Sequence, residues 1–212
     1  MFAWLFGDTH KTTSEYYQSH WHPGGDPDGN CARVQRFGLA GDGGKQVCVS
    51  DLDAAPANVL VSIGSNGEFS FEAAMLAAYP KLDVHIYDGT YLPPNLDDGS
   101  GAKRGATAVP PGMTYHHFNA HVGMHLPYLQ KRERAILKID CEGCEYTMVP
   151  WLVSKHAFDQ ILIETHVKSG VAQARGLHAF MSMLNVTHSV YSSEVNVRYA
   201  PCCTEFSLRR RR

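Results

Sequence analysis

Long apolar runs are missing from this chain of 212 residues, and their absence excludes one class of protein at the outset. No stretch of 18 apolar residues occurs, so we expect no membrane-spanning helix. An excess of charge of one sign is also missing. The 19 basic and 21 acidic residues give a formal net charge of −2, which offers no general indication of nucleic-acid binding. The sequence also contains no internal repeat and no low-complexity tract.

Metal-binding patterns are missing as well, although six cysteines and twelve histidines supply possible ligands. No His-x-x-x-His or paired Cys-x-x-Cys pattern makes a closed zinc site, and the one Cys-x-x-Cys pair lacks a second pair at the usual spacing, so we predict no metal site. Cys31 and Cys48 flank a glycine-rich segment, where they either pair as a loop clamp or remain partly buried thiols. Cys202 and Cys203 can approach the Cys-x-x-Cys pair in space.

The chain divides into a polar entry and a more regular body. Residues 1–50 are rich in Gly, His, Asp and aromatic residues and are expected to form a cap or lid. Residues 51–208 are expected to form the main domain, and residues 209–212 a solvated basic tail. The apolar run at residues 1–6 is too short for a signal peptide. We therefore expect a cytoplasmic location by default, or the secretory pathway if a targeting segment precedes this sequence.

Short apolar segments alternate with segments of helical periodicity from Asn58 onward. The predicted strands are residues 59–63, 82–87, 113–118, 135–139 and 158–163, preceded by a short one at 46–49 and followed by a pair at 186–191 and 204–208. The predicted helices are residues 68–79, 142–156 and 172–184. This alternation predicts an α/β fold with a doubly wound, mostly parallel sheet. The last two strands have no helix between them and are expected to be antiparallel.

The turn after the first strand of the body is typical of a nucleotide-like binding site. Gly64 and Gly67 allow the backbone to approach a ligand closely, and the following helix start offers free N–H groups. Asp88 ends the next strand, where an acid can accept both ribose hydroxyls of a nucleoside. Glu68 and Glu72 at the helix start are expected to repel a pyrophosphate. The pattern therefore favours S-adenosylmethionine over NAD, with a plain βα turn beside an acidic loop as the alternative.

The segment from Ala135 to Glu145 concentrates the chemistry of the second half of the chain. A buried strand ends in Asp140, and Cys141, Glu142 and Cys144 follow in the next turn. Carboxylates at the carboxyl end of a strand lie where open α/β sheets bind ligands. The cysteine spacing also permits a thioredoxin-like thiol oxidoreductase, although an acid between the cysteines disfavours the thiolate.

Several segments together resemble one family. Residues 61–72 resemble the cofactor motif of class I S-adenosylmethionine-dependent methyltransferases. Residues 137–143 resemble the KIDxEG motif of the FkbM-type branch, and residues 163–166 that branch's next strand end. Residues 36–38, 41–48 and 202–208 resemble a eukaryotic methyltransferase-like domain related to FkbM. The resemblance covers about residues 31–208, and it departs in having Gly-x-x-Gly in place of the commoner Gly-x-Gly, and cysteines on both sides of Glu142.

The resemblance implies a Rossmann-like methyltransferase that uses S-adenosyl-L-methionine to methylate a hydroxyl of an unknown acceptor, which could be a small molecule or a glycan. The expected cofactor-binding residues are Gly64, Ser65, Asn66, Gly67, Asp88 and Asn119. The expected catalytic residues are Asp140, Glu142, Glu164 and His166. Asp140 is expected at the boundary between cofactor and acceptor, with His166 or Glu164 as base or orienting partner. The remaining alternative is a catalytically silent domain that binds the cofactor or a partner.

Overall fold

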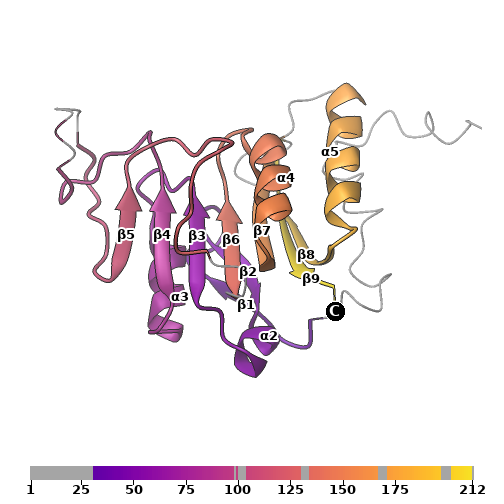
Figure 1. Cartoon of the computed structure of the whole chain (residues 1–212), viewed down its shortest axis with the longest axis horizontal. Helices are drawn as coiled ribbons and strands as arrows, with labels where there is room; N and C mark the ends of the chain where they lie inside the picture. Colours follow the sequence, from indigo (N-terminus) through magenta and orange to yellow (C-terminus); the bar gives the residue numbers. More distant parts are fainter. Residues whose placement is uncertain are drawn as a thin grey trace, which may run out of the picture.

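A seven-stranded sheet runs through the centre of the computed structural model (Figure 1). Its strands are β3 (Val59–Ile63), β4 (Asp83–Tyr87), β5 (Met113–His116), β6 (Ala135–Ile139), β7 (Phe158–His166), β8 (His188–Val195) and β9 (Cys203–Arg210). The spatial order is β5-β4-β3-β6-β7-β9-β8. The first five strands are mutually parallel, and β9 is antiparallel to both of its neighbours. The predicted doubly wound α/β fold with an antiparallel carboxyl-terminal pair is therefore confirmed.

The structure describes residues 31–97, 99, 104–129, 134–166, 171–196 and 202–211, and for residues 171–175 it describes the backbone only. The first thirty residues of the predicted cap lie outside this part of the chain. Within the described residues, no helix has the length and apolar character needed to cross a membrane.

Alternate side chains of the central strands enter two separate hydrophobic cores. In β3, Val59, Val61 and Ile63 join one core, and Leu60 joins the other. Helices α4 (Glu145–Lys155) and α5 (Val171–Leu184) close the first core. Helices α2 (Val49–Ala54) and α3 (Ser70–Ala78) close the second. The continuous burial of β3 and β6 agrees with a parallel sheet that is covered on both faces.

The described part of the predicted cap is a β-hairpin that packs against the sheet. Strands β1 (Val34–Phe37) and β2 (Lys45–Cys48) pair antiparallel, and a disulfide joins Cys31 to Cys48. The backbone N–H and C=O of Cys48 both bond the Gln160 amide of β7, at 2.9 Å each. Val47 and Cys48 are fully buried, so this hairpin belongs to the second core as well as covering it.

Several boundaries differ from the sequence prediction for local reasons. Helix α4 starts at Glu145 instead of Glu142, because Glu142 and Gly143 have φ values of 56° and 110°, which a right-handed helix excludes. The same helix continues through Pro150 to Lys155. Strand β9 extends to Arg210, so the start of the predicted basic tail is part of the sheet.

The connections on either side of β5 contain no helix in the residues that the structure describes. The face of β4 that carries His85 and Tyr87 is covered by a loop instead. The Tyr128 ring of this loop stacks on the His85 ring with centroids 3.5 Å apart, and its hydroxyl bonds that of Tyr87 at 2.5 Å. Aromatic stacking thus covers a surface that a crossover helix commonly covers in doubly wound sheets.

Candidate active site

The predicted site residues meet at the carboxyl ends of the parallel strands. Gly64 follows β3 and has a φ of 79°. A Cβ atom placed on Gly64 would lie 1.7 Å from the backbone oxygen of Asp140, which follows the neighbouring strand β6. Only glycine therefore permits the two turns to lie side by side. The backbone N–H of Asp140 donates to the Ile63 carbonyl at 2.9 Å and completes this contact.

Asp88 organises the turn after β3 from the end of β4. One carboxylate oxygen accepts the backbone N–H groups of Ser65 at 2.9 Å and Asn66 at 2.6 Å, together with the Ser65 hydroxyl. The other oxygen accepts the backbone N–H and the hydroxyl of Thr90. Burial acts to raise the pKa of Asp88, but these hydrogen bonds outweigh it and hold the pKa below its usual value. The carboxylate thus fixes the shape of the turn, and a ribose hydroxyl has to share or displace these donors.

Gly67 and Asn119 were both predicted to bind the cofactor, but they lie in different surroundings. A Cβ atom on Gly67 would lie 2.4 Å from the Tyr91 ring, so this aromatic ring rests on the turn itself. Asn119 is exposed beyond β5, and its backbone nitrogen would lie 2.5 Å from a Cβ on Gly89. Asn119 therefore contacts the segment that follows Asp88 and lies beside, not within, the turn of Gly64 to Gly67.

A buried ion pair supports the turn from beneath. The ammonium of Lys138 lies 3.7 Å from Glu72 of α3 and donates to the Gly64 carbonyl oxygen. The same Glu72 carboxylate accepts the Ser62 hydroxyl at 2.5 Å. The sequence argument that Glu72 repels phosphates is therefore weakened, because Lys138 neutralises this carboxylate inside the protein. Glu68 instead accepts the backbone N–H of Ser70 at 2.8 Å, near the start of α3.

Lys45 of the hairpin enters the site from the second core. Its side chain is 1% exposed, and its ammonium contacts Glu205 of β9, Asp140 at 3.5 Å and Glu164 of β7 at 3.7 Å. Asn196 donates to the other oxygen of Glu164 at 3.0 Å. Glu164 and Glu205 are direct register partners in adjacent strands, so one buried cation has to compensate neighbouring carboxyl groups.

These contacts distribute the protons unequally. Burial opposes the charge of Lys45, but the carboxylates of Glu205, Asp140 and Glu164 raise its pKa above the usual value. For Asp140, burial is outweighed by Lys45 and Lys138, and the pKa is lowered. Burial, together with the charges of Asp140 and Glu205, raises the pKa of Glu164 to about 8. At neutral pH, Asp140 therefore carries the negative charge and Glu164 holds a proton.

His166 ends β7 among four carboxyl groups. Glu145, fully buried at the start of α4, accepts the His166 backbone N–H at 2.8 Å and lies 3.1 Å from the ring Nδ1. The ring Nε2 lies 3.6 Å from Glu142 and 3.7 Å from Asp140. Burial acts to lower the pKa of His166, but Glu145 and Asp140 outweigh it and raise the pKa to about 9. The structure therefore favours an imidazolium at neutral pH, which fits the expected role of orienting partner better than that of base.

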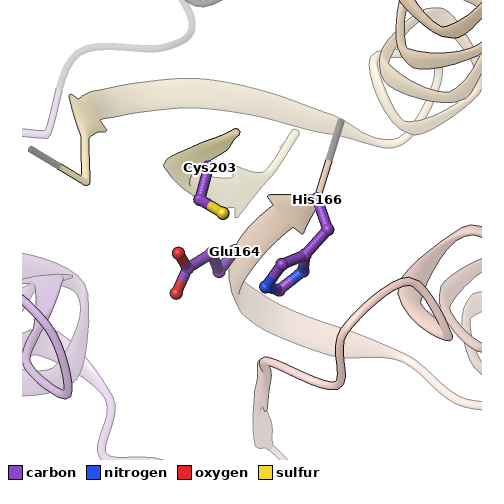
Figure 2. Close-up of side chains that lie close together, drawn as sticks. All are labelled: Glu164, His166 and Cys203. Atoms are coloured by element: carbon purple, nitrogen blue, oxygen red, sulfur yellow. The ribbon is translucent and has the colours of Figure 1, made fainter. Parts of the chain in front are cut away.

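Two disulfides flank this histidine. Cys141 and Cys144 are joined within the turn that carries Glu142, whose side chain is 89% exposed. Cys202 and Cys203 are joined at the start of β9, where Cys203 is the register partner of His166. The Sγ of Cys203 and donor atoms of Glu164 and His166 lie within 4.8 Å of one another, and Figure 2 shows these three side chains close together.

Two hollows on the described part of the molecule lie away from this site. One has a volume of about 630 Å³ and is lined by Trp151, His156 and Arg210 among others, near the amino ends of the parallel strands. A second hollow of about 300 Å³ lies beside β5. None of the residues predicted to form the site lines either of them. The chemistry of the carboxyl edge therefore carries more weight for function than the size of these cavities.

Sequence reasoning missed Lys45, Glu145 and Glu205, although two of them left a signal. Lys45 alternates with buried Val47, which places both on the inner face of β2. Glu145 shares the buried helical stripe of Met148, Val149 and Leu152. Glu205 lies in a strand that is buried on nearly every residue, and no periodicity marked it as a site residue.

Comparison with known proteins gives a family match over most of the chain. The family described as "Methyltransferase domain" matches residues 7–100 and 112–209. No curated protein matches this sequence.

The solved structures that resemble this chain are only distantly similar to it. The fibrillarin/Nop5p complex gives a TM-score of 0.46 at 5% identity, covering 72% of each chain. The fibrillarin pre-rRNA processing protein of Methanococcus jannaschii gives 0.44 at 7% identity, covering 73% of this chain and 67% of that one. Human N-acetylserotonin methyltransferase in complex with SAM gives 0.39 at 7% identity, covering 73% of this chain and 48% of that one. These low scores carry no functional argument, and the fold assignment rests on the strand order itself.

Proposed function

Because the chain belongs to the methyltransferase-domain family, we propose that it transfers a methyl group from S-adenosyl-L-methionine to a hydroxyl of a still unidentified acceptor. Family membership argues against the alternative of a thiol oxidoreductase, because the Cys-x-x-Cys pair lies within the matched methyltransferase domain. The finer kinship with FkbM-related proteins is part of the proposal. Its support is the KIDxEG-like segment, which forms the turn between β6 and α4 that presents Asp140.

One observation carries the proposal: the turn after β3 and the turn after β6 are in direct contact. A ligand held by the backbone at Gly64 to Gly67 lies next to Asp140, because Gly64 touches the Asp140 carbonyl. Methyl transfer requires the acceptor within about 3–3.5 Å of the methyl carbon. The contact between the two turns supports the proposal that a cofactor side and an acceptor side adjoin here.

The acceptor side consists of Asp140 with its partners. Asp140 lies between Lys45 and His166, at 3.5 Å and 3.7 Å, so its carboxylate is held in place from two directions. We assign Asp140 the role of orienting the acceptor hydroxyl and of accepting the proton that this hydroxyl loses on methylation. Glu164 and His166 act as orienting partners, and Glu142 is the exposed member at the entrance.

Calorimetric titration with S-adenosylmethionine tests the cofactor half of the proposal. We expect binding to the wild-type protein and at least about tenfold weaker binding by Asp88→Asn, because the amide cannot accept from every donor of the turn. The matched control is Asp97→Asn, which changes a side chain that is 80% exposed and should leave affinity unchanged. Absence of binding by well-folded wild type at millimolar cofactor would contradict the proposal.

Transfer of a labelled methyl group into fractionated extract tests the acceptor half. A labelled product that Asp140→Asn fails to form would identify the acceptor and support the role of Asp140. Cofactor binding without any labelled product would favour a catalytically silent binding domain.

A further inference from the structure

We propose that Glu164, His166 and Cys203 form a zinc site that opens when the disulfide between Cys202 and Cys203 is reduced. The three side chains offer one oxygen, one nitrogen and one sulfur ligand, all within 4.8 Å of one another. They come from adjacent strands, and Figure 2 shows the Cys203 sulfur directed toward the other two side chains. A metal site was not predicted from the sequence, because these residues have none of the familiar zinc spacings.

The choice of metal follows from the ligand set. Imidazole nitrogen, thiolate sulfur and carboxylate oxygen are the three ligand types that proteins use for zinc, with bond lengths of about 2.0–2.3 Å. These bonds place tetrahedral ligands about 3–4 Å apart. Small side-chain rotations therefore suffice to bring the three donors into contact with one ion. Harder cations such as magnesium take oxygen ligands and disfavour this mixture.

The contacts of His166 orient its ring in a way that suits metal binding. Buried Glu145 lies 3.1 Å from Nδ1, which leaves Nε2 directed toward the interior of the site. A carboxylate behind the ligating ring is the usual arrangement in protein zinc sites, because it fixes the orientation of the ring. Asp140 lies 3.7 Å from Nε2 and is placed to supply a fourth ligand.

The charge of the site favours a dication despite the neighbouring ammonium. Asp140, Glu142 and Glu145 each have a carboxylate oxygen within 3.7 Å of the His166 ring, whereas Lys45 contacts the Oδ2 atom of Asp140 and the Oε2 atom of Glu164. The Oδ1 atom of Asp140 faces His166 and its Oδ2 atom faces Lys45. The same carboxylate can therefore serve the ammonium on one side and a metal on the other.

The disulfide makes occupancy conditional. While Cys203 is bonded to Cys202, its sulfur carries no thiolate and is a poor ligand. A phosphine or dithiol reductant supplies two electrons and two protons, which break the S–S bond and yield two thiols. Uptake of Zn²⁺ then releases the thiol proton of Cys203 and the protons that His166 and Glu164 hold. Metal and disulfide are thus mutually exclusive states of one residue.

A pair of neighbouring cysteine variants gives the sharpest test. Cys202→Ser frees Cys203 without reductant and leaves the disulfides of Cys31–Cys48 and Cys141–Cys144 in place. Titrated with Co²⁺, it should bind one ion per chain, show thiolate-to-metal absorbance in the near ultraviolet, and release the ion to Zn²⁺. Cys203→Ser also leaves one free thiol, one residue away, and should show no such band. Wild-type protein without reductant should behave like Cys203→Ser.

Two further variants separate a metal site from a free thiol that binds metal alone. In the Cys202→Ser background, His166→Gln should abolish binding, and Glu145→Gln should weaken it about 10- to 100-fold by loosening the ring. If circular dichroism shows that Cys202→Ser is unfolded, wild-type and Cys203→Ser proteins lacking Cys141 and Cys144 are compared in phosphine. Equal binding by the Cys202→Ser and Cys203→Ser variants, or binding by neither, overturns the proposal.

Discussion

Gly64 is the residue on which the two halves of the site depend. Replacement by alanine is expected to cost about 2–5 kcal/mol of unfolding free energy, because a left-handed φ and a clash with the Asp140 carbonyl add together. Gly41→Ala is the matched control, since Gly41 has a φ of 82° and nothing within 4 Å of its added Cβ. Urea unfolding of both variants measures the difference, and equal losses would show that the contact between the turns is unimportant.

Single residues also show which features of the site can be predicted from the sequence and which cannot. Gly64, Asp88 and Asp140 were predicted because the residue at the end of each parallel strand has to lie at the same edge of the sheet. The proton distribution was not predictable, because the pKa of His166 depends on Glu145, which lies behind it in three dimensions. Lys45 was missed since no local pattern connects it with Glu205, 160 positions further along the chain.

Among the elements, the short β1–β2 hairpin supplies Lys45, whose ammonium contacts three carboxyl groups of the site. Lys45→Met is expected to cost about 3–5 kcal/mol, because it leaves the carboxyl groups of Asp140, Glu164 and Glu205 without their buried cation. Arg33→Met, at the residue immediately before β1, is the control. Its ion pair with Asp53 is mostly exposed, so its loss should cost less than about 1 kcal/mol. Denaturant unfolding of the two variants would contradict the expectation if both lost the same free energy.

The elements themselves were largely predictable from periodicity. Strands β3 and β6 have the predicted limits, because each is a continuous apolar segment bounded by turn residues. Helix α2 and the late start of α4 were not predicted. The first is only six residues long, and the second depends on the backbone of Glu142 and Gly143. Such features depend on a short segment length and on local backbone angles, which hydrophobic periodicity does not report.

At the scale of the whole molecule, His188 is expected to make the free energy of unfolding depend on pH. This buried histidine has Nε2 at 2.9 Å from the Phe158 carbonyl, and burial lowers its pKa with Arg210 contributing in the same direction. In the unfolded chain His188 therefore takes up a proton near pH 6.5, whereas in the folded state its lowered pKa means that it is protonated only at a lower pH. Stability contributed by neutral His188 is present above this pH and is lost as the pH falls toward the folded-state pKa.

Replacing His188 with glutamine should make unfolding less dependent on pH. Between pH 7 and 5 we expect wild type to lose more stability than His188→Gln, by at most about 1.4 kcal/mol per pH unit. Glutamine retains an N–H donor that can reach the Phe158 carbonyl, so the comparison isolates the titrating ring. Thermal or urea unfolding measured across this range checks the expectation, and parallel curves for the two proteins would contradict it.

The position of β9 between β7 and β8 has a consequence for how the protein is made. The strand that follows β8 in the chain has to insert between two strands that emerge from the ribosome before it. Until then, Lys45 has no Glu205 to contact, and His166 has no neighbouring Cys203. A chain that ends before β9 therefore carries the turn after β3 but lacks Glu205 and Cys203, and the carboxyl-edge cluster is completed only when β9 inserts into the sheet.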